Sequence, residues 1–180
     1  MWFILGQVQN RRAGVSISFL LECLDKGLVS KKAIDFEVSW GDEKGVAKII
    51  KAIARKRGIG RLLSEGVKRA SAEIGNGSVE FAVHVKGMEV AMHDPRGKKG
   101  VGLSYATSHK GADHMEALHD EAFENKNVLP DLGFRESMKR TDIKGKAKPV
   151  KITKDYWGTM ADCLVTCKFF MKPPRPFHRN

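Results

Sequence analysis

Residues 12–28, RAGVSISFLLECLDKGL, determine the fold class that this sequence predicts. Their apolar members recur three and four positions apart, which places them on one face of a helix. Gly27 stands near the end of the pattern, where a glycine commonly ends a helix. We therefore predict an amphipathic helix packed against a core. Its apolar face is formed by Ile17, Leu20, Leu21, Leu24 and Leu28.

Two downstream segments, 43–56 and 61–74, repeat this helical period, and each is followed by a glycine. Their apolar stripes are Val46, Ile49, Ile50 and Ile53 in the first and Leu63, Val67, Ala70 and Ile74 in the second. The period then changes to two over 79–86, which indicates a strand. The apolar members of that alternation are Val79, Phe81, Val83 and Val85. We predict a mostly α, multihelical fold with one short β element near residues 79–86.

The second half of the chain is less periodic. Residues 94–97 are typical of a turn, and 97–111 indicate a glycine-rich loop that enters a short helix. Residues 125–150 show no period and predict a linker or surface loop. We expect a last helix with Thr153 as its N-cap, an inner face that includes Cys167, and a proline-rich end. The other inner residues are Trp157, Met160 and Leu164, and the prolines are Pro173, Pro174 and Pro176.

Composition narrows the class of protein. The chain has 180 residues and a formal net charge of +11. This charge suits a nucleic acid, an acidic protein partner, or a chain whose acidic remainder lies elsewhere. The charge pattern does not favour nucleic-acid binding, because no basic stripe is interleaved with aromatic residues. The sequence has three cysteines, no secretory signal and no run of roughly 18 apolar residues. We therefore expect a cytoplasmic protein without a membrane segment.

Residues 94–114, DPRGKKGVGLSYATSHKGADH, concentrate small residues around side chains that can do chemistry. The glycines allow close backbone approach, Thr107 and Ser108 offer hydroxyls, and His114 can exchange a proton near neutral pH. Such a segment suits an oxygen-rich or phosphate-bearing ligand. The alternative is a structural loop capped by Asp113, and spacing alone favours that alternative.

Residues 162–167, DCLVTC, place Cys163 and Cys167 on one helical face. A thiolate can ligate zinc or an iron–sulfur cluster, but two thiols require further ligands from elsewhere. The alternative is that both are small buried hydrophobes, which spacing alone favours.

Taken together, five motifs resemble the aldehyde ferredoxin oxidoreductase family, whose members carry tungsten or molybdenum on pterins. The resemblance covers about residues 11–170, with the motifs in the family's order. These are residues 40–42 (WGD), 58–67 (GIGRLLSEGV), 81–87 (FAVHVKG), 94–114 and 162–167.

The resemblance implies an oxidoreductase that converts aldehydes to carboxylic acids with water as the oxygen source and ferredoxin as electron acceptor. It implies a metal held by two pterins, a neighbouring [4Fe-4S] cluster and multihelical C-terminal domains. Cys167 matches the fourth cluster ligand, and Asp162 matches an aspartate that accepts pterin N–H groups. Thr166 falls within the same cofactor-binding motif. His114 matches a catalytic histidine close to the metal.

The resemblance also implies domain boundaries and missing parts. We expect a non-matching leader at 1–10, a part of the middle domain at 11–95 and a truncated last domain at 96–180. The family's three-cysteine motif and catalytic glutamate have no counterpart, so we expect an enzyme fragment that needs a separate chain carrying the N-terminal domain. The motif's Gly-Leu is Val165-Thr166 here, and a β-branched residue should hinder pterin docking. A nonfunctional remnant and a basic helical binding module remain alternatives.

Overall fold

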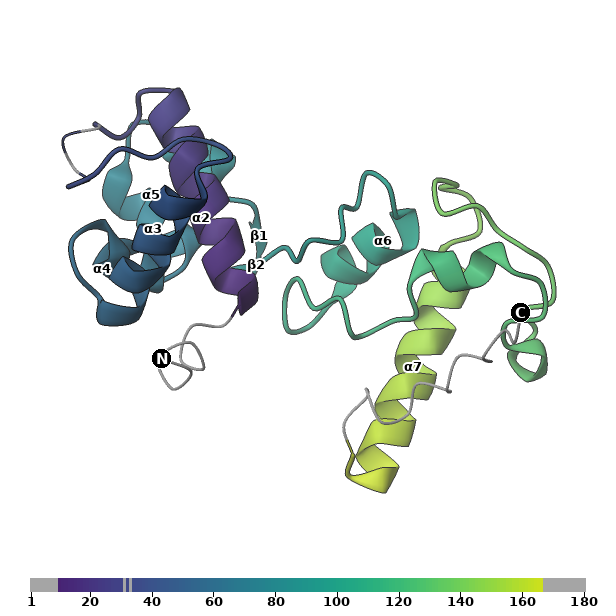
Figure 1. Ribbon diagram of the computed structural model, residues 1–180. Coiled ribbons are helices and arrows are strands. Elements are labelled where there is room, and N and C mark those ends of the chain that lie inside the picture. The colour runs from purple at the N-terminus through teal and green to yellow at the C-terminus, as the bar shows by residue number, and fades with distance from the viewer. Residues whose placement is uncertain (1–9, 31, 33, 167–180) are drawn as a thin grey trace, which may run out of the picture. The chain divides into compact units, whose positions relative to one another are not determined.

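The computed structural model describes residues 10–30, 32 and 34–166 (Figure 1). The chain divides into two compact units. The first contains Met1–Met92 with His109–Ala112, and the second contains His93–Ser108 with Asp113–Asn180. Over the described residues, the secondary structure is mainly helical with one two-stranded sheet, which confirms the predicted fold class. The assignment of these units to the family's middle and last domains stays a prediction.

In the first unit, α2 (Asn10–Asp25) contacts α3 (Glu43–Arg55), α4 (Ile59–Ser64) and α5 (Val67–Ile74) (Figure 1). The apolar stripes predicted from the sequence meet in its core, because each helix buries one face. The buried core residues include Ile17, Leu20, Leu21, Ile49, Ile53, Leu63, Val67 and Ala70.

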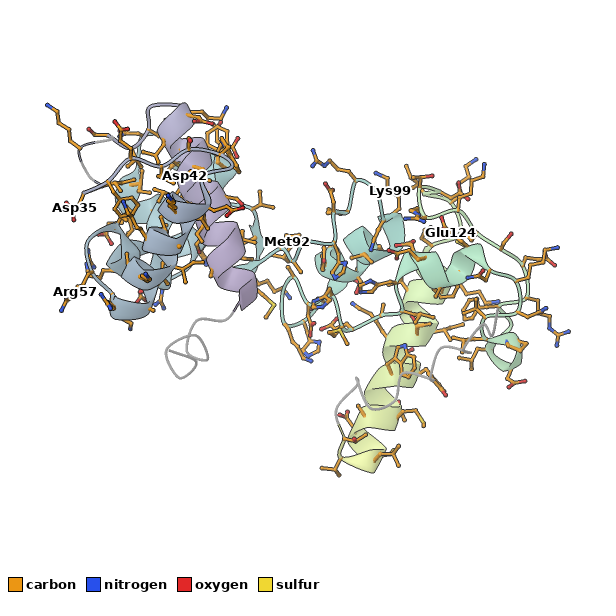
Figure 2. All side chains as sticks on the ribbon, viewed as in Figure 1. Asp35, Asp42, Arg57, Met92, Lys99 and Glu124 are labelled. Carbon is orange, nitrogen blue, oxygen red and sulfur yellow. The ribbon has the colours of Figure 1, made fainter. Side chains whose placement is uncertain are left out.

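The ends of these helices are determined by local chemistry. Asp42, labelled at the start of α3 in Figure 2, accepts a hydrogen bond from the Gly45 amide at 3.0 Å and so caps the helix. Gly60 lets α4 approach α3 closely, because a Cβ at this position would lie 2.1 Å from the carbonyl carbon of Ala52. The helix predicted over 61–74 is broken at Gly66, whose φ of 86° is the left-handed region that favours glycine.

The predicted strand is only partly correct. Ser78–Phe81 forms a 3₁₀ helix, η2, and the sheet is limited to β1 (His84–Val85) paired antiparallel with β2 (Met88–Glu89). Val79 and Val83 are 65% and 59% exposed. The alternation therefore does not separate a buried face from a solvated one, which is the condition that makes a period of two diagnostic.

The second unit contains α6 (Lys99–Thr107), η3 (Asp120–Glu124), η4 (Pro130–Leu132) and α7 (Ala147–Leu164). Helix α6 packs against α7 and η3, and Figure 2 labels Lys99 and Glu124 in these elements. The rings of Phe123 and Phe134 meet edge to face, with centroids 5.3 Å apart. The buried apolar residues of this unit include Val101, Tyr105, Ala117, Phe123, Phe134 and Val150.

Helix α7 begins six residues earlier than the sequence indicates, so Thr153 is not its N-cap. Thr153 is fully buried inside the helix, where its hydroxyl donates to the Pro149 carbonyl at 2.7 Å and accepts from the Leu118 amide at 3.2 Å. Residues 125–150 are accordingly more than a linker, since they contain η4, buried Phe134 and the start of α7.

The predicted inner face of the last helix is also incorrect in part. Leu164 is 57% exposed, whereas Pro149, Val150 and Thr153 are the buried positions of α7. Trp157 and Met160 are half-buried. Cys167 and the prolines at 173, 174 and 176 lie outside the described residues. Among the helices that the structure describes, none is both long and apolar enough to cross a bilayer.

Candidate functional site

The second unit opens on the predicted turn at residues 94–97. The Asp94 carboxylate accepts the Arg96 amide at 2.8 Å and the guanidinium of the same residue, with Nη2 at 2.6 Å. These hydrogen bonds lower the pKa of Asp94 from its ordinary 3.8 to about 2. The turn is thus held by a local ion pair, as its composition predicts.

The glycines that follow serve internal packing. A Cβ at Gly100 would lie 2.7 Å from an Asp120 carboxylate oxygen, and one at Gly102 would lie 2.9 Å from the Pro95 Cβ. In the first unit, a Cβ at Gly111 would lie 2.5 Å from the Val85 carbonyl oxygen. These three glycines therefore have a packing role, and whether the segment also binds a ligand stays a prediction. At these three positions the space is filled by the protein itself.

A buried carboxylate explains the contact of α6 with η3. Asp120 accepts the Gly100 and Val101 amides at 3.0 and 2.9 Å, and so satisfies two donors in the first turn of α6. It also pairs with Lys146 Nζ at 2.8 Å, and both side chains are at least 95% buried. A negative charge beside the start of a helix is favourable, because it opposes the positive end of the helix dipole.

The two candidate hydroxyls, those of Thr107 and Ser108, also make hydrogen bonds within the second unit. The Ser108 hydroxyl donates to buried Glu116 at 2.7 Å, and Glu116 pairs with Lys154 Nζ at 3.0 Å. Lys154 further donates to the Thr107 hydroxyl at 3.1 Å. These contacts connect the end of α6 to α7.

His114 lies in a cluster of imidazoles. Its ring stacks on that of His93, with centroids 4.9 Å apart and an interplanar angle of 27°. The His119 ring contacts both edge-on, at 4.5 Å from His93 and 5.9 Å from His114. His119 Nε2 also donates to the His114 carbonyl at 2.8 Å. The cluster thus fixes both the backbone and the ring of His114.

An ion pair borders this cluster. Lys98 Nζ lies 3.4 Å from His93 Nδ1 and pairs with Glu121. Burial opposes ionisation of Glu121, but hydrogen bonds and attraction to Lys98 and His119 outweigh burial and lower the pKa of this carboxyl. Glu121 is therefore a carboxylate near neutral pH.

The other predicted site residues stand at the end of α7. Asp162 and Cys163 are exposed, and Asp162 makes no side-chain hydrogen bond or ion pair within the described part of the chain. The Val165 amide donates to the Asp162 carbonyl at 3.3 Å, and the Thr166 amide donates to the Ala161 carbonyl at 3.1 Å. This pair of bonds is a Schellman motif, in which Val165 adopts φ 47° and ψ 46°.

The fold and these motifs define a class of protein. Residues 10–179 match the family model described as aldehyde ferredoxin oxidoreductase, domains 2 and 3. The chain therefore belongs to this family.

Similar proteins include an aliphatic sulfonate oxidoreductase, WOR-like subunit, from Pyrococcus furiosus, which is 39% identical over 56% of this chain and 17% of its own length. A tungsten-containing aldehyde ferredoxin oxidoreductase from Thermococcus kodakarensis is 27% identical over 87% of this chain and 25% of its own length. One from Pyrococcus horikoshii is 34% identical over 57% of this chain and 17% of its own length. The chain spans a quarter or less of the length of these relatives.

The catalytic role of His114 stays a prediction, and the sequence did not indicate its stacking on His93. No spacing rule joins His93 to a histidine 21 positions later. His119 is a nearer candidate, five residues beyond His114. The cofactor roles of Asp162, Thr166 and Cys167 stay predictions.

Proposed function

We propose that the chain supplies one side of the cofactor site of a tungsten- or molybdenum-dependent oxidoreductase that converts aldehydes to carboxylic acids. The observation that carries this proposal is the exposed Asp162 carboxylate in the last turn of α7, in a chain that matches the family. A carboxylate at the negative end of a helix dipole is unfavourable alone. Hydrogen bonds from N–H groups of a bound molecule to the Asp162 carboxylate would compensate for this unfavourable interaction with the helix dipole.

The chemistry of Asp162 fits a pterin. Its carboxylate has two acceptor oxygens, which suit a ring that presents paired N–H donors. Thr166 follows directly after the Schellman turn, where its hydroxyl would help to hold the same ring. When bound, the metal–pterin group supplies the two-electron oxidation of an aldehyde and water to a carboxylic acid and two protons. His114 is the group on this chain that would take up a released proton.

Electron transfer requires parts from outside the described residues. A [4Fe-4S] cluster needs four ligands, and the sequence has three cysteines, of which Cys23 is fully buried in α2. We assign Cys167 as one ligand and expect the other three from a separate chain that carries the family's N-terminal domain. Ferredoxin would accept the electrons, and the cysteine content fits a cytoplasmic setting.

The test reconstitutes the cofactor site from two polypeptides. The chain is produced anaerobically, alone and together with a polypeptide that carries the three-cysteine domain of a family member. Alone, it should lack the broad visible absorption of a cluster and show no aldehyde oxidation. Together, the two chains should retain tungsten or molybdenum, measured by mass spectrometry, and reduce a dye with an aldehyde.

In that complex, Asp162→Asn should lose the bound metal. Asp155→Asn is the matched control, because Asp155 is exposed on α7 and, among the residues that the structure describes, pairs with Lys151 at 2.6 Å. Equal metal content in the two variants would refute the role of Asp162. A stoichiometric cluster on the lone chain would refute the assignment of ligands.

A further inference from the structure

A hollow on the surface of the first unit collects positive charge. Its walls come from the connection between α4 and α5, the first turn of α5 and the turn between β1 and β2, and its volume is about 390 Å³. Three cations and one carboxylate line it, which leaves two positive charges in excess. Sites for small molecules begin at about 300 Å³. The lining residues are Ser64, Glu65, Lys68, Arg69, Lys86 and Gly87.

Two of the three cations are available to an anion from outside. Arg69 Nη1 donates to the Glu65 carboxylate at 2.7 Å, so these two charges balance each other. The ammonium groups of Lys68 and Lys86 make no hydrogen bond or ion pair with any residue that the structure describes. The excess charge of the hollow therefore belongs to these two lysines.

The β1–β2 turn brings the two lysines together. Lys86 and Gly87 are the two residues between the paired strands, and both are left-handed, with φ of 53° and 83°. Positive φ at both positions is the requirement of a type I′ hairpin turn. Lys68 reaches this turn from α5, because a Cβ at Gly87 would lie 3.4 Å from Lys68 Cδ. The turn and the helix thus present one ammonium group each to the same hollow.

A lysine at the first position of this turn is unusual. Asparagine, aspartate and glycine are the common residues there, because they adopt the left-handed conformation at lower cost. Lys86 is exposed, so burial does not explain the choice. What distinguishes lysine from asparagine at this place is its positive charge. A residue held in an unfavourable backbone conformation beside a hollow points to a function for its side chain.

We propose that this hollow binds a small molecule bearing a phosphate monoester, held by the ammonium groups of Lys68 and Lys86. Such a group carries about 1.5 to 2 negative charges at neutral pH, which matches the two charges in excess. Lysine binds phosphate as a point charge and needs no fixed geometry. The inference does not depend on the proposed cofactor site, because these lysines belong to the first unit, whereas His114 and Asp162 belong to the second.

The experiment titrates the full 180-residue chain at neutral pH and constant ionic strength with two probes, inorganic phosphate and glycerol phosphate, a small monoester. The NMR signal of the Gly87 amide should shift and saturate with both, because both carry a dianionic phosphoryl group. Acetate, which has a single charge, should cause no saturable shift. In Lys86→Asn the dissociation constant should rise roughly tenfold, as expected for the loss of one charge-assisted hydrogen bond. Asparagine before glycine suits the turn, so this variant keeps the hairpin.

Lys56→Asn is the matched control. Lys56 is exposed and left-handed, with φ of 50°, and lies in the same unit but not in the lining of the hollow. This variant removes the same charge and should leave the dissociation constant unchanged. Should Lys86→Asn fail to fold, Lys68→Gln makes the same comparison, with Lys51→Gln in exposed Lys51 of α3 as its control.

Three results would overturn the proposal. Equal weakening in a variant and its control would mean that phosphate responds only to the net charge of the chain. Acetate bound as tightly as phosphate would contradict recognition of a dianion. Saturation by inorganic phosphate alone, or by neither probe, would exclude a site for a monoester. The titration needs no metal or pterin, so a failure of the Asp162 metal test leaves its result standing.

Discussion

The buried pair of Asp120 and Lys146 allows a quantitative test of what holds the second unit together. Lys146→Met would keep the length of the side chain and remove its charge. The Asp120 carboxylate, 2% exposed, would then keep the amides of Gly100 and Val101 as its partners among the described residues. The change therefore isolates the contribution of the ammonium group.

The expected cost follows from these contacts. Removing one partner of a buried ion pair costs about 3–5 kcal/mol, because an uncompensated charge stays buried. The two amide bonds and the start of α6 still stabilise the carboxylate, which favours the lower end. Lys146 Nζ also donates to the Lys139 carbonyl at 2.7 Å, and losing this bond adds about 1 kcal/mol. We therefore expect a total loss of about 4 kcal/mol.

The assay is amide hydrogen exchange under native conditions, which reports stability locally and so separates the two units. The Gly100 and Val101 amides should lose protection in Lys146→Met. Lys148→Met is the control, because Lys148 is exposed in the first turn of α7 and should change stability by no more than about 0.5 kcal/mol. Equal protection of the two amides in both variants would refute the role given to the pair.

Two further predictions concern the turn residues of the second unit. Val165→Gly should stabilise the end of α7 by about 1 kcal/mol, because Val165 is 92% exposed and left-handed. Thr159→Gly in the same helix should instead destabilise it by roughly 0.3 kcal/mol, the difference between the helix propensities of the two residues. Thermal unfolding monitored by circular dichroism distinguishes the two signs. The Asp94–Arg96 turn should contribute stability above pH 4 and lose it as the pH falls through about 2, because the folded pKa of Asp94 is lowered. The NMR chemical shift of the Arg96 amide, which donates to Asp94, should therefore change between pH 4 and pH 2. A midpoint of this change near pH 4 would contradict the prediction.

The elements that the sequence predicted correctly are those with one buried face. Helices α2 and α3 follow their apolar stripes closely, because burial of each stripe in one core imposes the helical period. The break between α4 and α5 was missed, since it depends on the conformation of Gly66 and not on the period. The Val67 amide after this break is satisfied by Glu89, 22 residues away, and no local pattern indicates such a partner.

The imidazole cluster was predictable only in part. His114 could be found from its motif, whereas His93 and His119 meet it only through the path of the chain. The buried pair of Asp120 and Lys146 was missed because of its residue types. Asp120 and Lys146 are residue types that composition places at the surface, and only pairing makes their burial possible. A segment without period was therefore mistaken for a linker.

The end of α7 shows why a departure from a family motif has to be judged by conformation. The resemblance places a glycine where this chain has Val165, and the sequence alone suggests that close approach to a pterin is hindered. The structure provides another reason for that glycine: the position is the left-handed residue of a Schellman motif, where an L side chain costs about 1–2 kcal/mol. The backbone bonds of the motif are nevertheless made from Val165 and Thr166 to carbonyls of α7. The substitution thus weakens the end of the helix, although both hydrogen bonds of the turn after Asp162 are made. Because the Val165 side chain is 92% exposed, restoring glycine should change stability without removing any packing around Asp162.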